Sequence, residues 1–525
     1  MIKNFIDKLL GKTSPTSRGA ASDESTYGQR QDVPAKVHRI DPDLVDDRAL
    51  DVVHTLKDAG FEAYIVGGAV RDLLLGLRPK DFDVATDATP EQVKQLFRRA
   101  FIIGRRFRIV HVVYGRGREN EVIEVSTMRA YLDSADAEQV SGNERTSKGA
   151  LANMKHAVDA SGRVLRDNVW GPIEQDAARR DFSINAMYYD PETQTVVDFH
   201  NGIRDAKKRV LRMIGDPATR YREDPVRIIR AVRFAAKLSP LGFKFDAGTI
   251  KPLASSRRLL LDVPQSRLFD EMLKLLQTGH ALASVEQLKA VGLDSGIYPL
   301  LDVVVQRAAD PFVRTALEDT DRRVGEGKPV VASFLLACVL WSDVRQGWAK
   351  RLKARPNQRP MPTSQALQEA VDEVFESRIG DVSGRGKLGA DMRDIWMMQL
   401  RFDKRVGNGP HSLVEQPRFR AGFDFMRLRA STGEIDASLA DWWEDFQHAS
   451  DDERDEMIEA QRRQPAPKGG ARRASASKAR DDEADDSTEP NTDERADGEA
   501  DAPAKKRRRR RRKPGAGGDA PAAAE

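Results

Sequence analysis

Residues 64–86 read YIVGGAVRDLLLGLRPKDFDVAT, and the fold of the surrounding chain is decided there. An apolar strand is expected to run into Gly67-Gly68, and a helix to begin near Ala69. Glycines at such a strand-to-helix turn let backbone N–H groups approach phosphate oxygens, and the helix N-terminus adds partial positive charge. Two glycines at a tight turn are more often simple geometry, so the turn alone predicts no function.

Asp81 and Asp83 flank Phe82 where the same stretch enters a second expected strand. Because side chains alternate along a strand, both carboxylates are expected on one face and Phe82 on the other. Two carboxylates on one face repel unless a cation lies between them, and oxygen ligands suit Mg²⁺, the partner of nucleoside triphosphates. Glu124 is expected to add a third ligand from a neighbouring strand. The alternative for Asp81 and Asp83 is a solvated strand end.

The Gly-Gly turn, Arg71-Asp72 and the DFDVAT segment, at this spacing, resemble the head of the class II transfer-RNA nucleotidyltransferase and bacterial poly(A) polymerase family. A second segment, RRDFSINA at residues 179–186, is similar to the family signature RRDFTINA. The resemblance implies template-independent nucleotidyl transfer by two metal ions, Mg²⁺ or Mn²⁺, with Asp81, Asp83 and Asp181 as catalytic positions. A helix-start residue with a local arginine pair is the alternative for Asp181.

A third segment, Glu223 to Arg227, resembles the EDxxR motif that selects the incoming nucleotide in relatives. Asp224 and Arg227 lie three residues apart, so they are expected to share one helix face, where an acceptor and a two-pronged donor can read a base edge. An intrahelical salt bridge is the alternative. The resemblance assigns nucleotide binding to Gly67, Gly68, Arg71, Arg180, Asn185, Asp224, Arg227 and Arg230.

Residues 102–112, IIGRRFRIVHV, resemble a run that marks the poly(A)-adding members and that CCA-adding members usually lack. Arg105, Arg106 and Arg108 there are expected to hold phosphates, with a solvated basic turn as the alternative, and His111 is expected to be a packed strand residue. The end of the helical region also resembles the poly(A)-adding members, and no His-Asp dipeptide occurs. The resemblance therefore implies polyadenylation of RNA with ATP. CCA addition to transfer RNA and a non-catalytic RNA-binding protein remain the alternatives.

The patterning predicts an α+β chain, with a small α/β head followed by an elongated all-helical body, and the resemblance implies that the head is a nucleotidyltransferase head. Residues 133–162 are polar and patternless, which predicts a mobile excursion, and only helices are expected from Asp224 to Trp443. Arg267 and Glu271, four residues apart, are expected to brace the body. The expected parts are an N-terminal amphipathic segment and disordered linker (1–36), the head (37–190), a nucleotide- and RNA-binding neck (191–275), the helical body (276–455) and a disordered acidic and basic tail (456–525).

Composition sets limits on location and partners. The 525 residues are 32% charged with a net charge of only +4, which hides a run of nine basic residues from Lys505 to Lys513 after an acidic stretch. A flexible polycation binds RNA backbones without sequence preference. The single cysteine, Cys338, is expected to be a small buried hydrophobe in a reducing, cytoplasmic compartment. Residues 1–12 form an amphipathic pattern that suits peripheral contact with a membrane surface.

Overall fold

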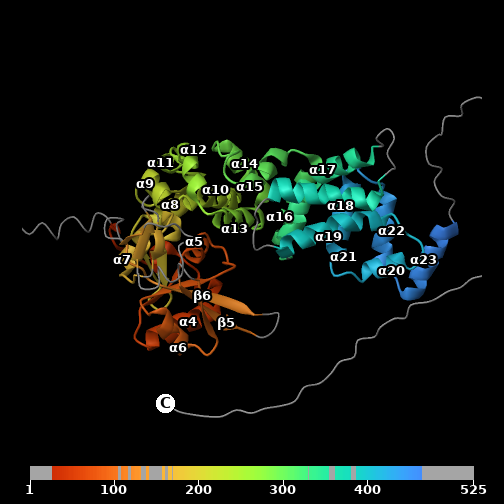
Figure 1. The fold of residues 1–525 in the computed structure, drawn as a ribbon. Coiled ribbons are helices and arrows are strands. Elements are labelled where there is room, and N and C mark those ends of the chain that lie inside the picture. The colour runs from red at the N-terminus through yellow and green to blue at the C-terminus, as the bar shows by residue number, and fades with distance from the viewer. Residues whose placement is uncertain are drawn as a thin grey trace, which may run out of the picture. The chain divides into compact units, whose positions relative to one another are not determined.

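The computed structural model describes residues 27–104, 108–115, 120–131, 138–140, 156–159, 164–167, 169–328, 330–353, 361–379 and 386–463. Its head, which contains the labelled strands β5 and β6 in Figure 1, is built on a mixed sheet. In the described residues this sheet has eight strands, in the order β1-β11-β10-β2-β3-β6-β5-β4. Strands β3 and β6 are parallel, and the other neighbours are antiparallel. The strands are β1 (Gln31–Pro34), β2 (Ala63–Val66), β3 (Asp83–Thr86), β4 (Ala100–Ile103), β5 (Ile109–Tyr114), β6 (Glu121–Thr127), β10 (Met187–Asp190) and β11 (Thr195–Asp198).

Helices α4 (Asp47–Asp58) and α6 (Pro90–Leu96) pack on one face of this sheet. The apolar positions of α4 recur at helical spacing, and Val52 and Leu56 are fully buried in the core. Complete burial of each such side chain contributes about 2 kcal/mol. Helix α6 starts with a capping box between Thr89 and Gln92, which satisfies two backbone donors at its N-terminus. The sequence expectation of a small α/β head is confirmed.

The opposite face of the sheet is covered unevenly. Helix α7 (Ile173–Ala178) packs there with Val66, Ala85 and Tyr188, which lie on β2, β3 and β10. Toward β4, at the edge of the sheet, Phe101 and Val122 are 57% and 39% exposed. The part under α7 positions the site described below, and the part of the same face near β4, where no described helix packs, adjoins it.

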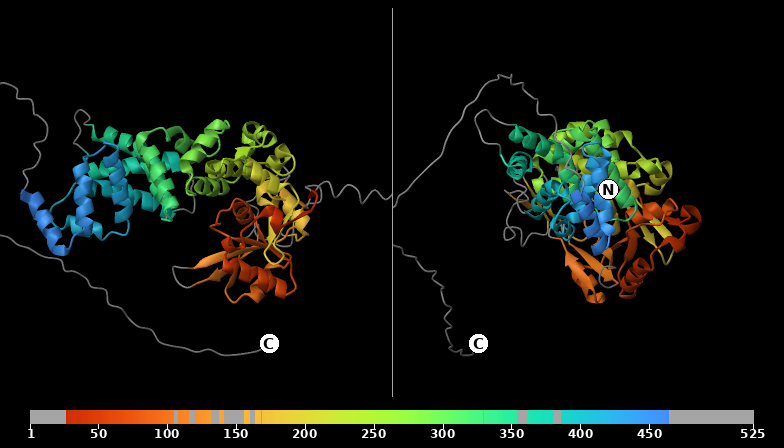
Figure 2. Two further views of the ribbon diagram at one scale, coloured as in Figure 1. Left: turned by 180° about the vertical axis from the view of Figure 1, so that it is seen from behind. Right: turned by 90° about the vertical axis from the view of Figure 1, so that its right-hand side faces the viewer.

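From residue 202 onward helices dominate, as expected. The elements are α8 (Gly202–Lys208), β12 (Val210–Leu211), α9 (Pro217–Glu223), α10 (Val226–Leu238), β13 (Lys244–Phe245), α11 (Ala247–Ile250), α12 (Leu253–Ser256), α13 (Gln265–Leu276), α14 (Ala281–Ala290), α15 (Pro299–Arg307), α16 (Pro311–Gly325), α17 (Ala332–Leu352), α18 (Thr363–Val374), α19 (Gly386–Phe402), α20 (Gly409–Val414), α21 (Phe419–Ser431), α22 (Ala437–His448) and α23 (Asp451–Arg463). Helix α17 packs against both α18 and α19, and the three lie side by side in Figure 1 and from behind in Figure 2.

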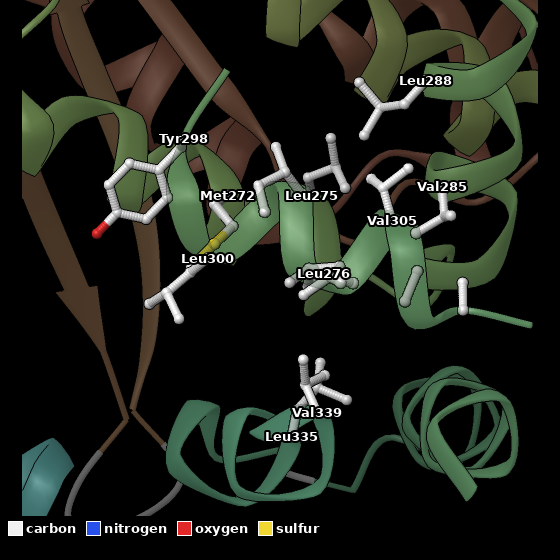
Figure 3. Packing of buried hydrophobic residues seen from close by; sticks show 14 of the residues in the cluster. Met272, Leu275, Leu276, Val285, Leu288, Tyr298, Leu300, Val305, Leu335 and Val339 are labelled. Carbon is white, nitrogen blue, oxygen red and sulfur yellow. The ribbon is translucent and has the colours of Figure 1, made fainter. Parts of the chain in front are cut away.

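One large apolar core joins the neck helices to the body helices. Figure 3 shows part of it, with Leu276 at the end of α13 facing Leu335 and Val339 of α17. These residues are at most 1% exposed. Leu335 and Val339 lie four residues apart, so they share the face of α17 that is turned to α13. Helix α13, which carries residues of the site, is therefore held from the body side by close packing.

The aromatic residues near the end of the body, read as core from the sequence, are core residues. The indole N–H of Trp396 donates to the Ala337 carbonyl at 3.1 Å, so the only polar atom of the buried side chain is satisfied. Cys338 is fully buried, which confirms the prediction of a small buried hydrophobe, and burial raises the pKa of its thiol. The aromatic residues concerned are Trp396, Phe423, Phe425, Trp442 and Trp443.

Several expected boundaries were wrong. Residues 31–34, read as linker, form β1 and pair with β11, because a four-residue edge strand is too short to show a period. The segment 133–162, read as patternless, contains β7 (Glu138–Val140) and β8 (His156–Asp159). Strand β8 pairs with β7 on one side and with β9 (Val164–Asp167) on the other. The expected run of helices is interrupted by β13, which pairs with β12. Helix α23 continues to Arg463, beyond the expected start of the tail.

The proposed membrane-contact segment, residues 1–12, and the basic run, residues 505–513, lie outside the described residues. So do Arg105 and Arg106 of the basic turn, whereas Arg108 is described and pairs with Glu91 at the start of α6. None of the helices in the described parts of the chain combines the length and apolar content that crossing a bilayer requires.

Candidate active site

Asp83 and Glu124 are brought together by strand pairing. Asp83 opens β3, and the parallel register with β6 places it beside Glu124. Both side chains lie on the face of the sheet that is opposite to α4 and α6. Asp81 lies two residues before the strand, so the expectation that both aspartates belong to one strand was wrong for Asp81. Phe82 between them is 4% exposed and packs in the core, which turns Asp83 outward.

The carboxylate of Asp83 has an unusual proton affinity. Burial among surrounding protein atoms and then the neighbouring charge of Glu124 raise the pKa of Asp83 to about 6, with a further contribution from Asp81. Glu124 itself lies 3.2 Å from His111 Nε2. A carboxylate whose pKa is raised by burial and by neighbouring negative charge, as that of Asp83 is, is one that a divalent cation would relieve, so the residues fit the ion that the sequence predicts. Within the described residues, no three acidic, histidine or cysteine side chains gather as a metal-binding cluster.

Gly67 leaves a small open space next to Asp83. Its φ of +80° is a conformation that residues with a side chain rarely adopt. A Cβ at this position would lie 3.7 Å from Asp83 Oδ2 and 3.8 Å from Arg180 Nη1. The N–H of Gly67 donates to the Met187 carbonyl at 3.4 Å, so Gly67 contributes space here and not a backbone donor. Gly68 begins helix α5 (Gly68–Leu74).

Arg180 is oriented by a buried acid that the sequence analysis missed. Asp176, 1% exposed, accepts from Arg180 Nη2 at 3.0 Å, from the Tyr188 hydroxyl at 2.7 Å and from the Arg129 N–H at 3.1 Å. It also pairs with Arg179. Burial alone would raise the pKa of Asp176, but the two guanidinium groups outweigh it and hold the pKa well below its usual range. The spacing of four residues between Asp176 on α7 and Arg180 was the available signal.

A cavity of about 470 Å³ adjoins Arg180, between the head and α9, α10 and α13. Arginine and lysine side chains outnumber acids on its wall, and such a wall suits a polyanion such as a triphosphate. The wall includes six of the residues assigned to nucleotide binding or catalysis, namely Arg180, Asp181, Asn185, Asp224, Arg227 and Arg230. The other lining residues are Arg129, Arg179, Val226, Arg267, Asp270, Glu271 and Lys274.

Asp181 lies on this wall as the partner of two arginines. It accepts from Arg227 Nε at 3.0 Å and from Arg230 Nε at 2.6 Å. Burial acts to raise its pKa, but Arg230 and Arg227 prevail and hold the pKa of Asp181 well below its usual range. The sequence alternative of a local arginine pair was wrong, because its partners come from α10, 46 and 49 residues away.

Asp224 and Arg227 do not share one helix face. Asp224 ends α9 in an extended conformation, and Pro225 separates it from α10, so the single-helix expectation was wrong. Asp224 accepts from Arg267 at 3.1 Å, whereas Arg227 also donates to Glu223 at 2.9 Å. The expected pair of Arg267 with Glu271 is replaced by this contact.

Arg71 is placed behind the cavity. It is 2% exposed, pairs with Asp72 and donates from Nη1 to Asn185 Oδ1 at 2.9 Å. Asn185 lines the cavity, and Arg71 is absent from its wall. Arg71 therefore orients Asn185, and Asn185 presents its side chain toward the space where the sequence predicts nucleotide.

Glu271 pairs with Arg233 and Lys274 and not with Arg267, its expected partner. It is 6% exposed, lies 3.6 Å from Arg233 and 3.2 Å from Lys274, and its Oε2 atom has no hydrogen-bond partner. A buried carboxylate oxygen without a donor on the cavity wall is a place where a ligand donor gains a full hydrogen bond.

Family models match three parts of the chain. These are "Poly A polymerase head domain" at residues 63–212, "Probable RNA and SrmB- binding site of polymerase A" at residues 242–304, and "Polymerase A arginine-rich C-terminus" at residues 359–482. Together they place the same family along the head, neck and body.

Curated relatives match over most of the chain. Poly(A) polymerase I of Haemophilus influenzae is 39% identical over 86% of this chain and 96% of its own length. That of Salmonella typhi is 36% identical over 89% and 96%. The CCA-adding enzyme of Lactobacillus helveticus is 35% identical, over 43% of this chain and 49% of its own length. A solved CCA-adding enzyme of Bacillus stearothermophilus with CTP gives a TM-score of 0.46 at 22% identity, over 79% of this chain and 82% of that one.

Proposed function

Because this chain belongs to the bacterial poly(A) polymerase family and is a poly(A) polymerase, we propose that it adds AMP from ATP to RNA 3′ ends without a template. Pyrophosphate is the leaving group. The observation that carries the proposal is that the Asp83 carboxylate and the Arg180 guanidinium both lie within 4 Å of the position that a Cβ of Gly67 would take. Arg180 also lines the cavity, so the carboxylates and the basic wall adjoin one space.

We assign the cation to Asp81 and Asp83, with Glu124 as an additional ligand. A divalent cation, when bound, supplies charge that favours an ionised 3′-hydroxyl and a departing pyrophosphate. Arg180, held by Asp176, faces the triphosphate with a fixed guanidinium orientation. Because Gly67 has no side chain, it leaves the space beside Asp83 free, whereas a side chain at this position would occupy it. These residues bind and orient the two reactants.

Nucleotide selection is assigned to Asp224 and Arg227, with Arg230 and Asn185 beside them. Each of the first two is already held by protein partners, Asp224 by Arg267 and Arg227 by Asp181 and Glu223. A preorganised set presents one pattern of donors and acceptors without reorganisation when nucleotide enters. The protein would thus present a fixed pattern of hydrogen-bond donors and acceptors to the incoming base, which is the role of a template base in other polymerases.

The poly(A) product is favoured over CCA addition by the extent of similarity. The poly(A) polymerase relatives match through the helical body, whereas the CCA-adding relative of Lactobacillus helveticus matches 228 residues. Incubation of the protein with unstructured RNA and each nucleoside triphosphate separately is expected to give long tails with ATP alone. Addition restricted to transfer RNA that lacks its CCA end, with CTP followed by ATP, would establish the rival activity. No incorporation with any substrate would leave the non-catalytic RNA-binding alternative.

We further propose that the basic run Lys505 to Lys513 binds RNA backbone and that the acidic stretch 481–501 competes with it. On single strands each neutralised phosphate contributes about 0.7 to the slope of log affinity against log salt, so nine residues contribute at most about 6. Removing residues 464–525 is expected to flatten this slope while the KM for ATP is unchanged. Removing only 481–501 is expected to raise RNA affinity at low salt. An unaltered slope in the first case, or unaltered affinity in the second, contradicts the respective part.

We also propose a role in RNA processing and decay, whereas a cytoplasmic location and peripheral membrane contact through residues 1–12 stay predictions of the sequence. The first follows from the chemistry, because a single-stranded 3′ extension gives a 3′-exonuclease a place to start. Comparing RNA lifetimes in cells with and without the chain tests it. Fractionation of cells that express the chain with and without residues 1–12 tests the location and the membrane contact.

A further inference from the structure

A row of side chains runs from the catalytic carboxylates to the edge of the sheet. The register pairs Asp83 with Glu124, Glu124 with His111, and His111 with Phe101. Paired residues point to the same face, so the four side chains lie across β3, β6, β5 and β4 on the face opposite to α4 and α6. Phe101 thus ends a row that begins at the reacting centre.

This uncovered part of the face is apolar and exposed. Phe101 is 57% exposed, and Ile103, its next neighbour on the same side of β4, is 37% exposed. Val122, two residues before Glu124, is 39% exposed. Large apolar side chains that are exposed on one face of a sheet near its edge strand are costly in water, and they mark a contact surface. We call these three residues, together with His111, the open face.

The positively charged side chain of Arg99 lies at the margin of the open face. Arg99 lies two residues before Phe101, and its carbonyl accepts from the Val113 N–H at 3.0 Å, which continues the ladder between β4 and β5. Alternation therefore turns Arg99 to the same side as Phe101. Its guanidinium donates to the Gly115 carbonyl and to Asn120 Oδ1, so it is fixed above the ends of β5 and β6. An exposed aromatic ring beside a fixed cation is the combination that single-stranded nucleic acid uses for stacking and phosphate contact.

We propose that the open face binds the RNA primer upstream of its 3′ end, with a base stacked on Phe101 and a phosphate near Arg99. The inference rests on the proposed function, which brings the 3′-hydroxyl to Asp83. The basic cavity adjoins Asp83 on the side of Arg180 and takes the triphosphate, so the row toward Phe101 gives the primer an approach from the other side. A second copy of this chain, paired through the edge strand β4, is the occupant that the test must separate from RNA.

The strand register also sets the distance between Phe101 and Asp83. Three inter-strand steps of about 4.8 Å place Phe101 roughly 14 Å from Asp83 along the sheet. That span corresponds to about four nucleotides of a strand stacked at 3.4 Å per nucleotide. A trinucleotide that ends at Asp83 therefore stops short of Phe101, whereas a longer oligo(A) reaches it.

The experiment compares a labelled trinucleotide with an oligo(A) of about twelve nucleotides, by fluorescence anisotropy with the full chain. Phe101→Ala is expected to weaken binding of the longer RNA roughly tenfold and leave the trinucleotide unchanged, whereas Phe101→Trp retains the affinity. The KM of the longer primer in AMP addition is expected to rise in parallel, with the KM for ATP unchanged. Leu261→Ala, at an apolar side chain that is 71% exposed on another surface, serves as the matched control and is expected to change nothing.

Equal effects of Phe101→Ala on both RNA lengths, or none on either, would overturn the proposal. So would a dimer in light scattering that Phe101→Ala dissociates, because the open face would then pair two copies of the chain. RNA binding does not require AMP addition, so the proposed RNA-binding face and the proposed function can fail separately. Absence of AMP addition with intact Phe101-dependent binding removes the proposed function and leaves an RNA-binding face.

Discussion

Replacing Asp83 with Asn is expected to lower AMP addition to RNA at least about a thousandfold, because loss of a metal-bound carboxylate removes several kcal/mol of transition-state stabilisation. RNA affinity is expected to stay within about twofold, since backbone contacts carry most of it. Asp81→Ala is expected to behave in the same way. The measurement is incorporation of labelled AMP into oligo(A), together with anisotropy of the same RNA.

Glu121→Gln is the matched control for this substitution. Glu121 is an exposed carboxylate on β6, three residues before Glu124, but it pairs with Arg48 of α4 on the other side of the sheet. Its removal is expected to leave AMP addition unchanged. Retention of more than about a tenth of the activity by Asp83→Asn would remove Asp83 from the reaction.

The same position predicts a pH dependence. The pKa of Asp83 is raised to about 6, so falling pH neutralises the carboxylate below that value. Mg²⁺ affinity, measured by calorimetric titration of metal-free protein, is expected to be level above about pH 7 and to fall toward tenfold per pH unit below 6. In metal-free protein the raised pKa makes the contribution of Asp83 to stability fullest below about pH 4, and this contribution is lost as pH rises through 6. Asp83→Asn is expected to remove both dependences.

Asp181→Ala is expected to give the second largest effect, on ATP binding and on stability together. The substitution leaves Arg230 without its carboxylate and Arg227 with Glu223 only, and stranding buried charge costs roughly 3 kcal/mol. We expect a KM for ATP raised at least about tenfold, since Arg227 then loses its orientation. Thermal unfolding and ATP titration measure the two effects.

Asp343→Ala is the control that separates the effect on stability from the effect on ATP binding. Asp343 pairs with Arg307 in the helical body at 2.6 Å and is about as buried, so its loss is expected to lower stability without changing the KM for ATP. If Asp181→Ala instead lowers kcat with an unchanged KM and normal stability, Asp181 acts on the reacting atoms and not through its arginines.

The head could be predicted because its signals are local. The apolar strand before Gly67 and the alternation around Phe82 each depend on a few neighbouring residues. The resemblance of the RRDFSINA and EDPVR segments, together with Arg230, likewise identified six of the thirteen residues that line the cavity. The sequence also identified Asp83 on β3 and Glu124 on β6 as site carboxylates. That they lie directly beside each other could be known only from the strand register.

The partners within the site could not be predicted, because they come from distant segments. Asp181 meets Arg227 and Arg230 across 46 and 49 residues, and Asp224 meets Arg267 across 43. Spacing rules cover one helix or one strand, so they proposed Asp224 with Arg227 and Arg267 with Glu271 instead. Asp176 was missed although it lies four residues before Arg180, because that spacing alone does not distinguish a buried site acid from a surface ion pair.

The cavity wall also has a consequence for attempts to redesign nucleotide preference. Each charged side chain assigned to base discrimination is half of an ion pair whose other half belongs to a different segment, as with Asp224 and Arg267. A single substitution that alters the pattern offered to the base also releases an unmatched charge into the wall, and the released arginine can then swing into the vacated volume. Altered selectivity should therefore require concerted exchanges of both members of a pair. Libraries that vary Asp224 and Arg267 jointly are better starting points than scans of either position.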